Sequence, residues 1–184
     1  MTFHPSQYEY FLGIALPEPE NTFFAELKRS FQDQRPLSSP PHLTLLPPFE
    51  FPNWQRLDGL LQRWASHQEP FEAVLERVGS FKQKKHGTVF LEPRKGEPFK
   101  QLINSLNDFF IELEPVGNFH PHLTVGHKVP HEDMDTRKSQ LRAMELSLKW
   151  KIQSVTLYRH QPGEKWSVLK SYALGAAEAI AAES

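Results

Sequence analysis

PHLT stands at residues 41–44 and again at residues 121–124 of this chain. A shuffled chain of the same composition would contain this tetrapeptide on the order of 0.004 times, so the second copy is not a coincidence. Each copy opens a short apolar run, HLTLL or HLTV, which is too short for a helix and predicts a strand. The two copies therefore indicate that the chain repeats itself.

The segments around the two copies follow the same order. In the first half, the hydrophobic pattern predicts strands at residues 8–16, 42–46 and 71–81, with helices at 18–34 and 54–64. From residue 88 the order begins again, with strands at 88–93, 122–125 and 148–158, helices at 98–113 and 134–146, and a last strand at 166–174. We therefore expect one internally duplicated domain over residues 1–184, with lobes at about 1–86 and 87–174 and a frayed tail at 175–184.

The composition excludes several classes of function. The chain has no cysteine, which removes disulfides, thiolate metal sites and thiol nucleophiles. Its 21 Lys and Arg nearly balance its 22 Asp and Glu, so we expect no global attraction to long nucleic acid, only to a small anion or a strand end. Without a long apolar run or a basic and apolar leader, the sequence predicts a soluble cytoplasmic protein that does not bind membranes, and we expect a monomer.

Each predicted PHLT strand has a polar face and an apolar face. Residues i and i+2 of a strand share a face, so His42 and Thr44 point one way while Leu43 points the other. The same holds for His122 and Thr124. If the two halves face each other, two imidazoles and two hydroxyls project into one cleft. The alternative is that both histidines are symmetric core residues retained by the duplication.

Two imidazoles across a cleft suit acid–base chemistry near neutral pH. One histidine can take a proton from a nucleophile while the other delivers a proton to a leaving oxygen. A Thr hydroxyl beside each can donate a hydrogen bond to a negatively charged oxygen. Phosphodiester cleavage fits this set without a cofactor or a metal. His120 and His122 could together suggest a metal site, but no carboxylate lies nearby in the sequence to complete it.

These motifs resemble those of the two-histidine phosphoesterase superfamily and, more narrowly, the 2′-5′ RNA ligase/RNA 2′,3′-cyclic phosphodiesterase family. The resemblance covers roughly residues 8–174 and includes YFLGIALP at 10–17, HLTLLPPF at 42–49 and FHPHLTVGH at 119–127. It implies a bilobal α+β fold, with two antiparallel sheets flanked by helices around a central cleft. The strand and helix order alone leaves a parallel sheet equally open.

The resemblance also implies roles for individual residues. His42 would protonate the leaving ribose oxygen, His122 would take a proton from the attacking water, and Thr44 and Thr124 would hold the phosphate. Phe49, just after the first motif, is a candidate for stacking on a base.

One departure from the family pattern concerns the phosphate clamp. Many cyclic phosphodiesterases of the family carry a basic residue five positions after a motif histidine, where this chain has Pro47 and His127. We expect His127 and Lys128 to contact substrate instead. Lys84 or Arg159 is expected near the mouth of the cleft.

Two functions remain open at this point. The first is a metal-independent phosphodiesterase that acts on a 2′,3′-cyclic phosphate or a related RNA-derived phosphodiester, with 2′-5′ RNA ligase activity as an additional reaction. The second is a module that binds a small nucleotide or an RNA end with little turnover, because the clamp is absent. In both cases the expected partner is a small nucleotide or RNA end that carries a phosphodiester.

Overall fold

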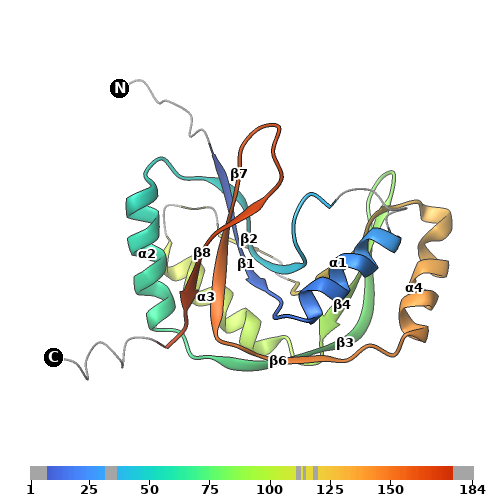
Figure 1. The fold of residues 1–184 in the computed structure, drawn as a ribbon. Coiled ribbons are helices and arrows are strands. Elements are labelled where there is room, and N and C mark those ends of the chain that lie inside the picture. The colour runs from blue at the N-terminus through green and yellow to red at the C-terminus, as the bar shows by residue number, and fades with distance from the viewer. Residues whose placement is uncertain (1–7, 32–36, 111–112, 114, 118–119, 176–184) are drawn as a thin grey trace.

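A computed structural model describes residues 8–31, 37–110, 113, 115–117 and 120–175 (Figure 1). Its strands are β1 (Glu9–Ala15), β2 (His42–Glu50), β3 (Phe71–Lys82), β4 (Gly87–Pro93), β5 (Leu123–Val129), β6 (Leu148–Ile152), β7 (Ser154–His160) and β8 (Ser167–Ala173). Its helices are α1 (Glu20–Phe31), α2 (Trp54–Ser66), α3 (Glu97–Phe109) and α4 (Met134–Ala143), the last preceded by a 3₁₀ turn at His131–Asp133. The tail expected to fray lies outside the described residues from residue 176 onward, as do the predicted helix ends at 32–34 and 111–112.

Local side-chain chemistry explains where the helices begin. The Asn53 side chain accepts a hydrogen bond from the backbone N–H of Arg56, at 2.9 Å, and so caps the start of α2. The Glu18 carboxylate accepts one from the backbone N–H of Thr22, at 3.2 Å, at the start of α1. In α3 a proline occupies the first turn, where its missing N–H costs nothing.

The strands form one eight-stranded antiparallel sheet in the order β6-β3-β4-β5-β2-β1-β7-β8. The expectation of two separate sheets is therefore wrong, and so is the parallel alternative. At the centre of the sheet β2 pairs with β5, where Leu43 lies opposite Leu123. The repeat predicts the strands themselves, but backbone hydrogen bonds between the two halves leave no pattern in the sequence.

The strand pairs cross the boundary between the two halves of the sequence. β3 comes before residue 87, yet it pairs with β4. β7 comes near the end of the chain, yet it pairs with β1. Each half of the sheet therefore contains strands from both halves of the sequence.

The sheet is curled, as the short connection between β6 and β7 shows: only Gln153 separates these two strands. In the sheet order β6 forms one edge, whereas β7 is next to the strand at the opposite edge. One residue can join them only if the two sides of the sheet approach each other, and in Figure 1 β7 descends into β6, which crosses the base of the molecule. The single strand expected at 148–158 is thus two strands, each on a different side of the sheet.

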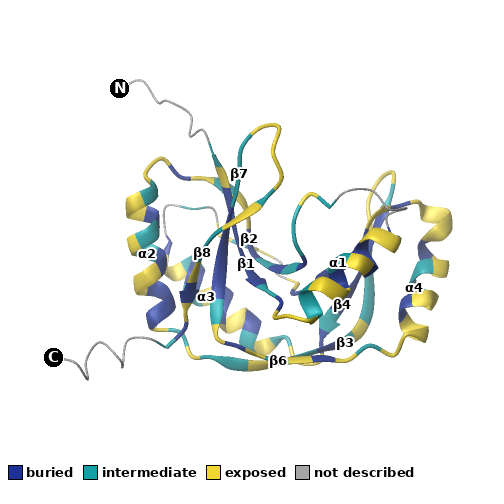
Figure 2. Ribbon diagram, viewed as in Figure 1, coloured by how far each residue is buried: buried dark blue, intermediate teal, exposed yellow. Residues whose placement is uncertain are grey.

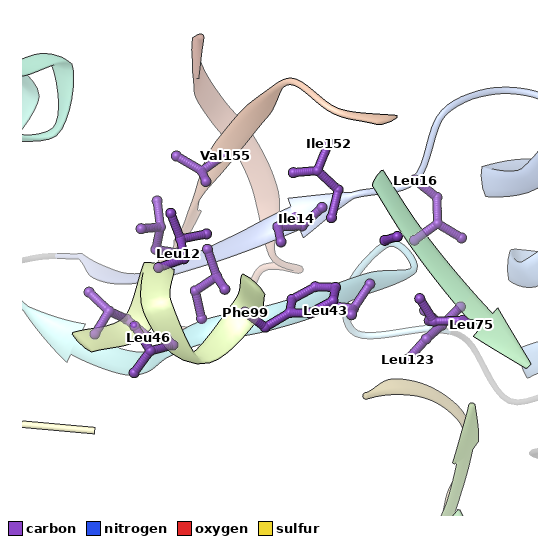
Figure 3. Close-up of a cluster of buried hydrophobic side chains, with 14 of the residues drawn as sticks. Leu12, Ile14, Leu16, Leu43, Leu46, Leu75, Phe99, Leu123, Ile152 and Val155 are labelled. Atoms are coloured by element: carbon purple, nitrogen blue, oxygen red, sulfur yellow. The ribbon is translucent and has the colours of Figure 1, made fainter. Parts of the chain in front are cut away.

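One face of the central strands forms the hydrophobic core. Leu12, Leu43 and Leu123 are fully buried and Ile14 is 1% exposed, and Figure 3 shows them clustered with Phe99 of α3. α1 packs against β5, α2 against β8, and α4 against β3 and β4. In Figure 2 the helices turn their exposed residues outward, away from the dark blue strands. Within the described ranges, no helix combines the length and apolar character needed to cross a bilayer.

The close approach of β3 and β4 gives a test of the packing. A Cβ built at Gly79 would lie 2.3 Å from the Phe90 ring, whereas one built at Gly59, on the exposed face of α2, meets nothing within 4 Å. We expect Gly79→Ala to lower the free energy of unfolding by about 1–3 kcal/mol, because the buried ring must move. Gly59→Ala should raise it by roughly 0.5–1 kcal/mol, because alanine favours the helix. Urea unfolding of both variants measures the difference, and equal stability of the two would contradict this packing.

Candidate active site

A pocket of about 370 Å³ opens where β2 and β5 meet. It contains the His and Thr side chains of both PHLT motifs, and the described residues that line it are Lys28, Leu37, Ser38, Ser39, His42, Thr44, His122, Thr124, His127 and Lys128. Strand alternation explains this arrangement, because the intervening Leu43 and Leu123 are fully buried on the other face.

The register of β2 against β5 also relates the four polar residues to one another. Leu43 lies opposite Leu123 in an antiparallel pair. Continuing that register by one residue in each direction sets His42 across from Thr124 and Thr44 across from His122. On this extension each imidazole would lie next to the hydroxyl of the other motif, and all four side chains line the same pocket.

Both imidazoles are held in the same way. Nδ1 of His42 lies 2.7 Å from the backbone oxygen of Pro40, and Nδ1 of His122 lies 2.7 Å from that of His120. A carbonyl oxygen only accepts hydrogen bonds, so each Nδ1 carries the proton and donates it. Each neutral ring therefore keeps an unprotonated Nε2 that can accept a proton.

Aromatic rings hold the two histidines from behind. The ring centroid of Phe11 lies 4.5 Å from that of His42, and Tyr158 stacks on Phe11 at 4.3 Å. On the other side, the Phe90 centroid lies 4.9 Å from His122 and that of Phe81 lies 5.1 Å away. This packing limits the rotation of both imidazoles and shields them from water.

Burial keeps both histidines neutral at physiological pH. It lowers the pKa of His42 to about 4, and the positive charges on Lys28 and His122 add to this effect, while the hydrogen bond to Pro40 opposes it. Burial also lowers the pKa of His122, and there the Glu92 carboxylate opposes the shift. A bound anion would raise both pKa values toward the range needed for proton transfer.

Lys28 is the charged residue of the pocket that the sequence analysis missed, and Leu37, Ser38 and Ser39 were missed as well. Lys28 lies on α1, is only 8% exposed and lines the pocket. Burial lowers the pKa of its ammonium group to about 8. The helical spacing could have revealed that Lys28 is buried. It falls four residues after Phe24 and three before Phe31, so it lies on the buried stripe of the helix.

The other predicted site residues divide into two groups. His127 and Lys128 line the pocket. Lys128 is the extra residue of a bulge in β5, with φ of 56°, and such a bulge redirects a side chain. Phe49 lies outside the lining, with its ring 6.1 Å from Tyr10 at the edge of the core.

Two further basic residues also lie outside the pocket lining. Lys84 is exposed in the β3–β4 turn. The Arg159 guanidinium lies over the Tyr8 ring at 4.7 Å. Neither is among the residues that line the histidine pocket.

The charge around the pocket favours an anion. Lys28 and Lys128 contribute cations, and the lining residues that the structure describes include no carboxylate. Nε2 of His120 lies 2.6 Å from a Glu92 carboxylate oxygen, so this ring has a partner in space that the sequence did not suggest. Among the described residues, no group of three or more His, Asp or Glu side chains is arranged to hold a metal ion.

Comparison with known proteins places this geometry in a family. A sequence model of the 2′-5′ RNA ligase superfamily matches residues 16–164. A protein of Halalkalibacterium halodurans that is provisionally named a phosphoesterase is 24% identical over 170 residues, covering 90% of this chain and 98% of its own. A protein with the same provisional name from Staphylococcus haemolyticus is 26% identical over 169 residues, covering 89% and 98%.

Solved structures share the fold. The Thermus thermophilus protein TT0787 aligns with a TM-score of 0.61 at 20% identity, covering 91% of this chain and 98% of its own. Escherichia coli LigT bound to 3′-AMP aligns with a TM-score of 0.58 at 19% identity, covering 92% and 99%. With the family match over most of the sequence, this chain belongs to the 2′-5′ RNA ligase superfamily and is an enzyme of the phosphoesterase or ligase type.

Proposed function

We propose that the protein is a metal-independent phosphodiesterase that hydrolyses a 2′,3′-cyclic phosphate or a related RNA-derived phosphodiester. His42 and His122 act as the acid and the base, and 2′-5′ ligation would open the same cyclic phosphate with the 5′-hydroxyl of a second RNA in place of water. One observation carries the proposal: both imidazoles are anchored through Nδ1 and border one pocket together with two Thr hydroxyls and a buried lysine. This arrangement supplies a base, an acid and donors for phosphate oxygens in one place.

The reaction needs two proton transfers. Nε2 of His122 takes a proton from water as the water oxygen bonds to phosphorus. The bond from phosphorus to one ribose oxygen breaks, and His42 gives its Nε2 proton to that oxygen. The products are a phosphomonoester and a free ribose hydroxyl, so the proton that His122 gained can return through solvent and reset the pair.

The remaining pocket residues would stabilise the phosphate. The hydroxyls of Thr44 and Thr124 donate hydrogen bonds to nonbridging oxygens, where negative charge increases in the transition state. Lys28 supplies a cation from α1, in place of the basic residue that family members carry five positions after a motif histidine. Because the pocket buries this cation, its attraction for an anion is screened less than that of a surface lysine.

The assignment of acid and base follows the family resemblance and has a physical requirement. As the acid, His42 must hold a proton although its pKa in the free protein is about 4. A bound phosphodiester places a negative charge between Lys28 and the imidazoles, which offsets the lysine and stabilises a protonated ring. Substrate binding and protonation of His42 are therefore linked.

Removing either histidine tests the proposal. We expect His42→Ala and His122→Ala each to lower kcat/KM for nucleoside 2′,3′-cyclic phosphates by about 10²–10⁴ in excess EDTA. His67→Ala is a matched control, because this ring bonds to Arg63 at the end of α2 and does not line the pocket. Tight nucleotide binding by the intact protein without turnover would instead support the RNA-end-binding module.

A substrate with a good leaving group separates the two roles. A nitrophenyl ester needs little protonation as nitrophenolate departs, so it should restore much of the activity of His42→Ala but not of His122→Ala. Restoration of His122→Ala alone would reverse the assignment.

The pH dependence of kcat/KM reports the ionisation of the free site. We expect a bell-shaped profile with its maximum below pH 6.5, because burial lowers the pKa of both histidines. The rate falls on the acidic side as the base gains a proton and on the alkaline side as the acid loses one. The kcat profile should lie at higher pH, because the bound anion raises both pKa values. A kcat/KM maximum at or above pH 7 would contradict this account.

Replacing Lys28 should affect binding and stability in opposite directions. Lys28→Met should weaken binding of a nucleoside 3′-monophosphate by roughly 10-fold or more, since a hydrogen bond to a charged group contributes about 1.5–3 kcal/mol. The same change should raise the melting temperature at pH 7, because a buried cation is removed. Isothermal titration and thermal unfolding measure the two effects, with Lys149→Met, whose side chain is 62% exposed, as the control.

The stability effect of Lys28 also has a defined pH range. The unfolded chain binds the Lys28 proton more tightly than the folded protein, whose Lys28 pKa is about 8, so stability should rise as pH increases from about 8 to the ordinary lysine pKa of 10.5. Lys28→Met should lack this rise. An identical pH dependence in both proteins would show that the ammonium group is not buried as described.

A further inference from the structure

A second pocket adjoins the histidine pocket and shares a wall with it. It has a volume of about 550 Å³ and is lined by Asn21, Ala25, Arg29, Leu37, Ser38, Ser39, Pro40, Pro41, Lys165 and Trp166. Leu37, Ser38 and Ser39 line both pockets. A ligand that fills the histidine pocket could therefore continue past this segment into the second pocket.

The second pocket is also cationic. Lys28 and Arg29 are consecutive residues of α1, and the first lines the histidine pocket while the second lines its neighbour. Lys165 adds another positive charge, and none of the described residues that line this pocket carries a carboxylate. By contrast, the pocket beside α4 mixes charges of both signs, with Glu76 and Glu145 beside Arg77 and Arg142. The two adjoining pockets thus differ in charge from the pocket beside α4.

Trp166 links the second pocket to the histidine site. Its backbone N–H donates to the backbone oxygen of Ser38, at 2.9 Å, which ties the segment before β8 to the shared wall. Its ring stacks on His160 at 5.0 Å and meets Phe11 edge-on at 4.7 Å. Phe11 in turn packs on His42. A chain of aromatic rings therefore fixes the position of the indole relative to the reacting imidazole.

We infer that this second pocket, with Arg29, Lys165 and Trp166, binds the nucleotide next to the reacting phosphodiester. The substrate class is then an RNA end of two or more nucleotides rather than a cyclic mononucleotide. Arg29 and Lys165 would contact the next backbone phosphate, and Trp166 would contact its sugar or base, since cations along a backbone and aromatic surfaces for bases are how single strands are held. This inference rests on the proposed function, because it takes the histidine pocket as the position of the phosphodiester.

A comparison of two substrates tests the subsite. We expect the protein to cleave a trinucleotide ending in a 2′,3′-cyclic phosphate with a kcat/KM at least 10-fold above that for the corresponding cyclic mononucleotide. In the double variant Arg29→Gln/Lys165→Gln this ratio should fall toward one. Arg142→Gln, from the pocket of mixed charge, is the matched control and should keep the ratio. Arg29 and Lys165 are both exposed, so their replacement should leave the fold intact.

A binding measurement tests the subsite independently of whether the protein catalyses the proposed reaction. The dissociation constant of a trinucleotide with a terminal 3′-phosphate should be at least 10-fold below that of a nucleoside 3′-monophosphate, and the double variant should remove this difference. Losing the contact with one backbone phosphate should also make the slope of log K against log salt shallower by about 0.7.

The possible outcomes are distinct. Equal kcat/KM and equal affinity for the short and long ligands, or a preference that survives in the double variant, would overturn the subsite while leaving the proposed reaction intact. Tighter binding of the trinucleotide that depends on Arg29 and Lys165, without any turnover, would support the subsite and reject the proposed reaction.

Discussion

The antiparallel pairing of β2 with β5 is the interaction on which the rest of the structure depends. Leu43 lies opposite Leu123 at the centre of the sheet, and both are fully buried. Because side chains alternate along a strand, this one register fixes which residues face the core and which face the pocket. A slip of one residue would turn a histidine into the core. The demand for buried leucines on one face thus positions the polar residues on the other.

Sequence alone predicts the elements well where a residue pattern has one physical cause. The alternation in HLTLL has such a cause and predicts both the strand and its polar face. Lys28 was missed because a lysine in a helix is assumed to lie in solvent, although its spacing from Phe24 and Phe31 argued otherwise. The role of Phe49 is ambiguous for a related reason: an aromatic residue after a motif suits a binding role and a packing role equally, and its ring lies near Tyr10 and outside the pocket lining. The single sheet could not be predicted from the sequence. Pairing between distant strands depends on backbone N–H and C=O groups, which nearly every residue carries.

The electrostatics of the pocket follow from burial more than from the local number of charges. The chain as a whole is nearly neutral, with a formal charge of −1. Nevertheless the histidine pocket holds a buried lysine and two imidazoles that burial keeps uncharged. Burying the charged Lys28 raises the free energy of the protein without ligand. A bound anion would lower that free energy again, because it pairs with the ammonium group. The site therefore attracts phosphate without the positively charged surface that binding to long nucleic acid would require.

The exchange of strands between the two repeats has a consequence for how the chain can fold as it leaves the ribosome. β1 is made first, but it needs β7 on one side, and β7 ends at His160. β3 leaves the first repeat to join β4, and its other neighbour, β6, comes only at residues 148–152. The N-terminal repeat is therefore not a folding unit that can close ahead of the rest. Nearly the whole polypeptide must be synthesised before either side of the sheet is complete, so newly made chains would expose the edges of β1 and β3 until synthesis is almost finished.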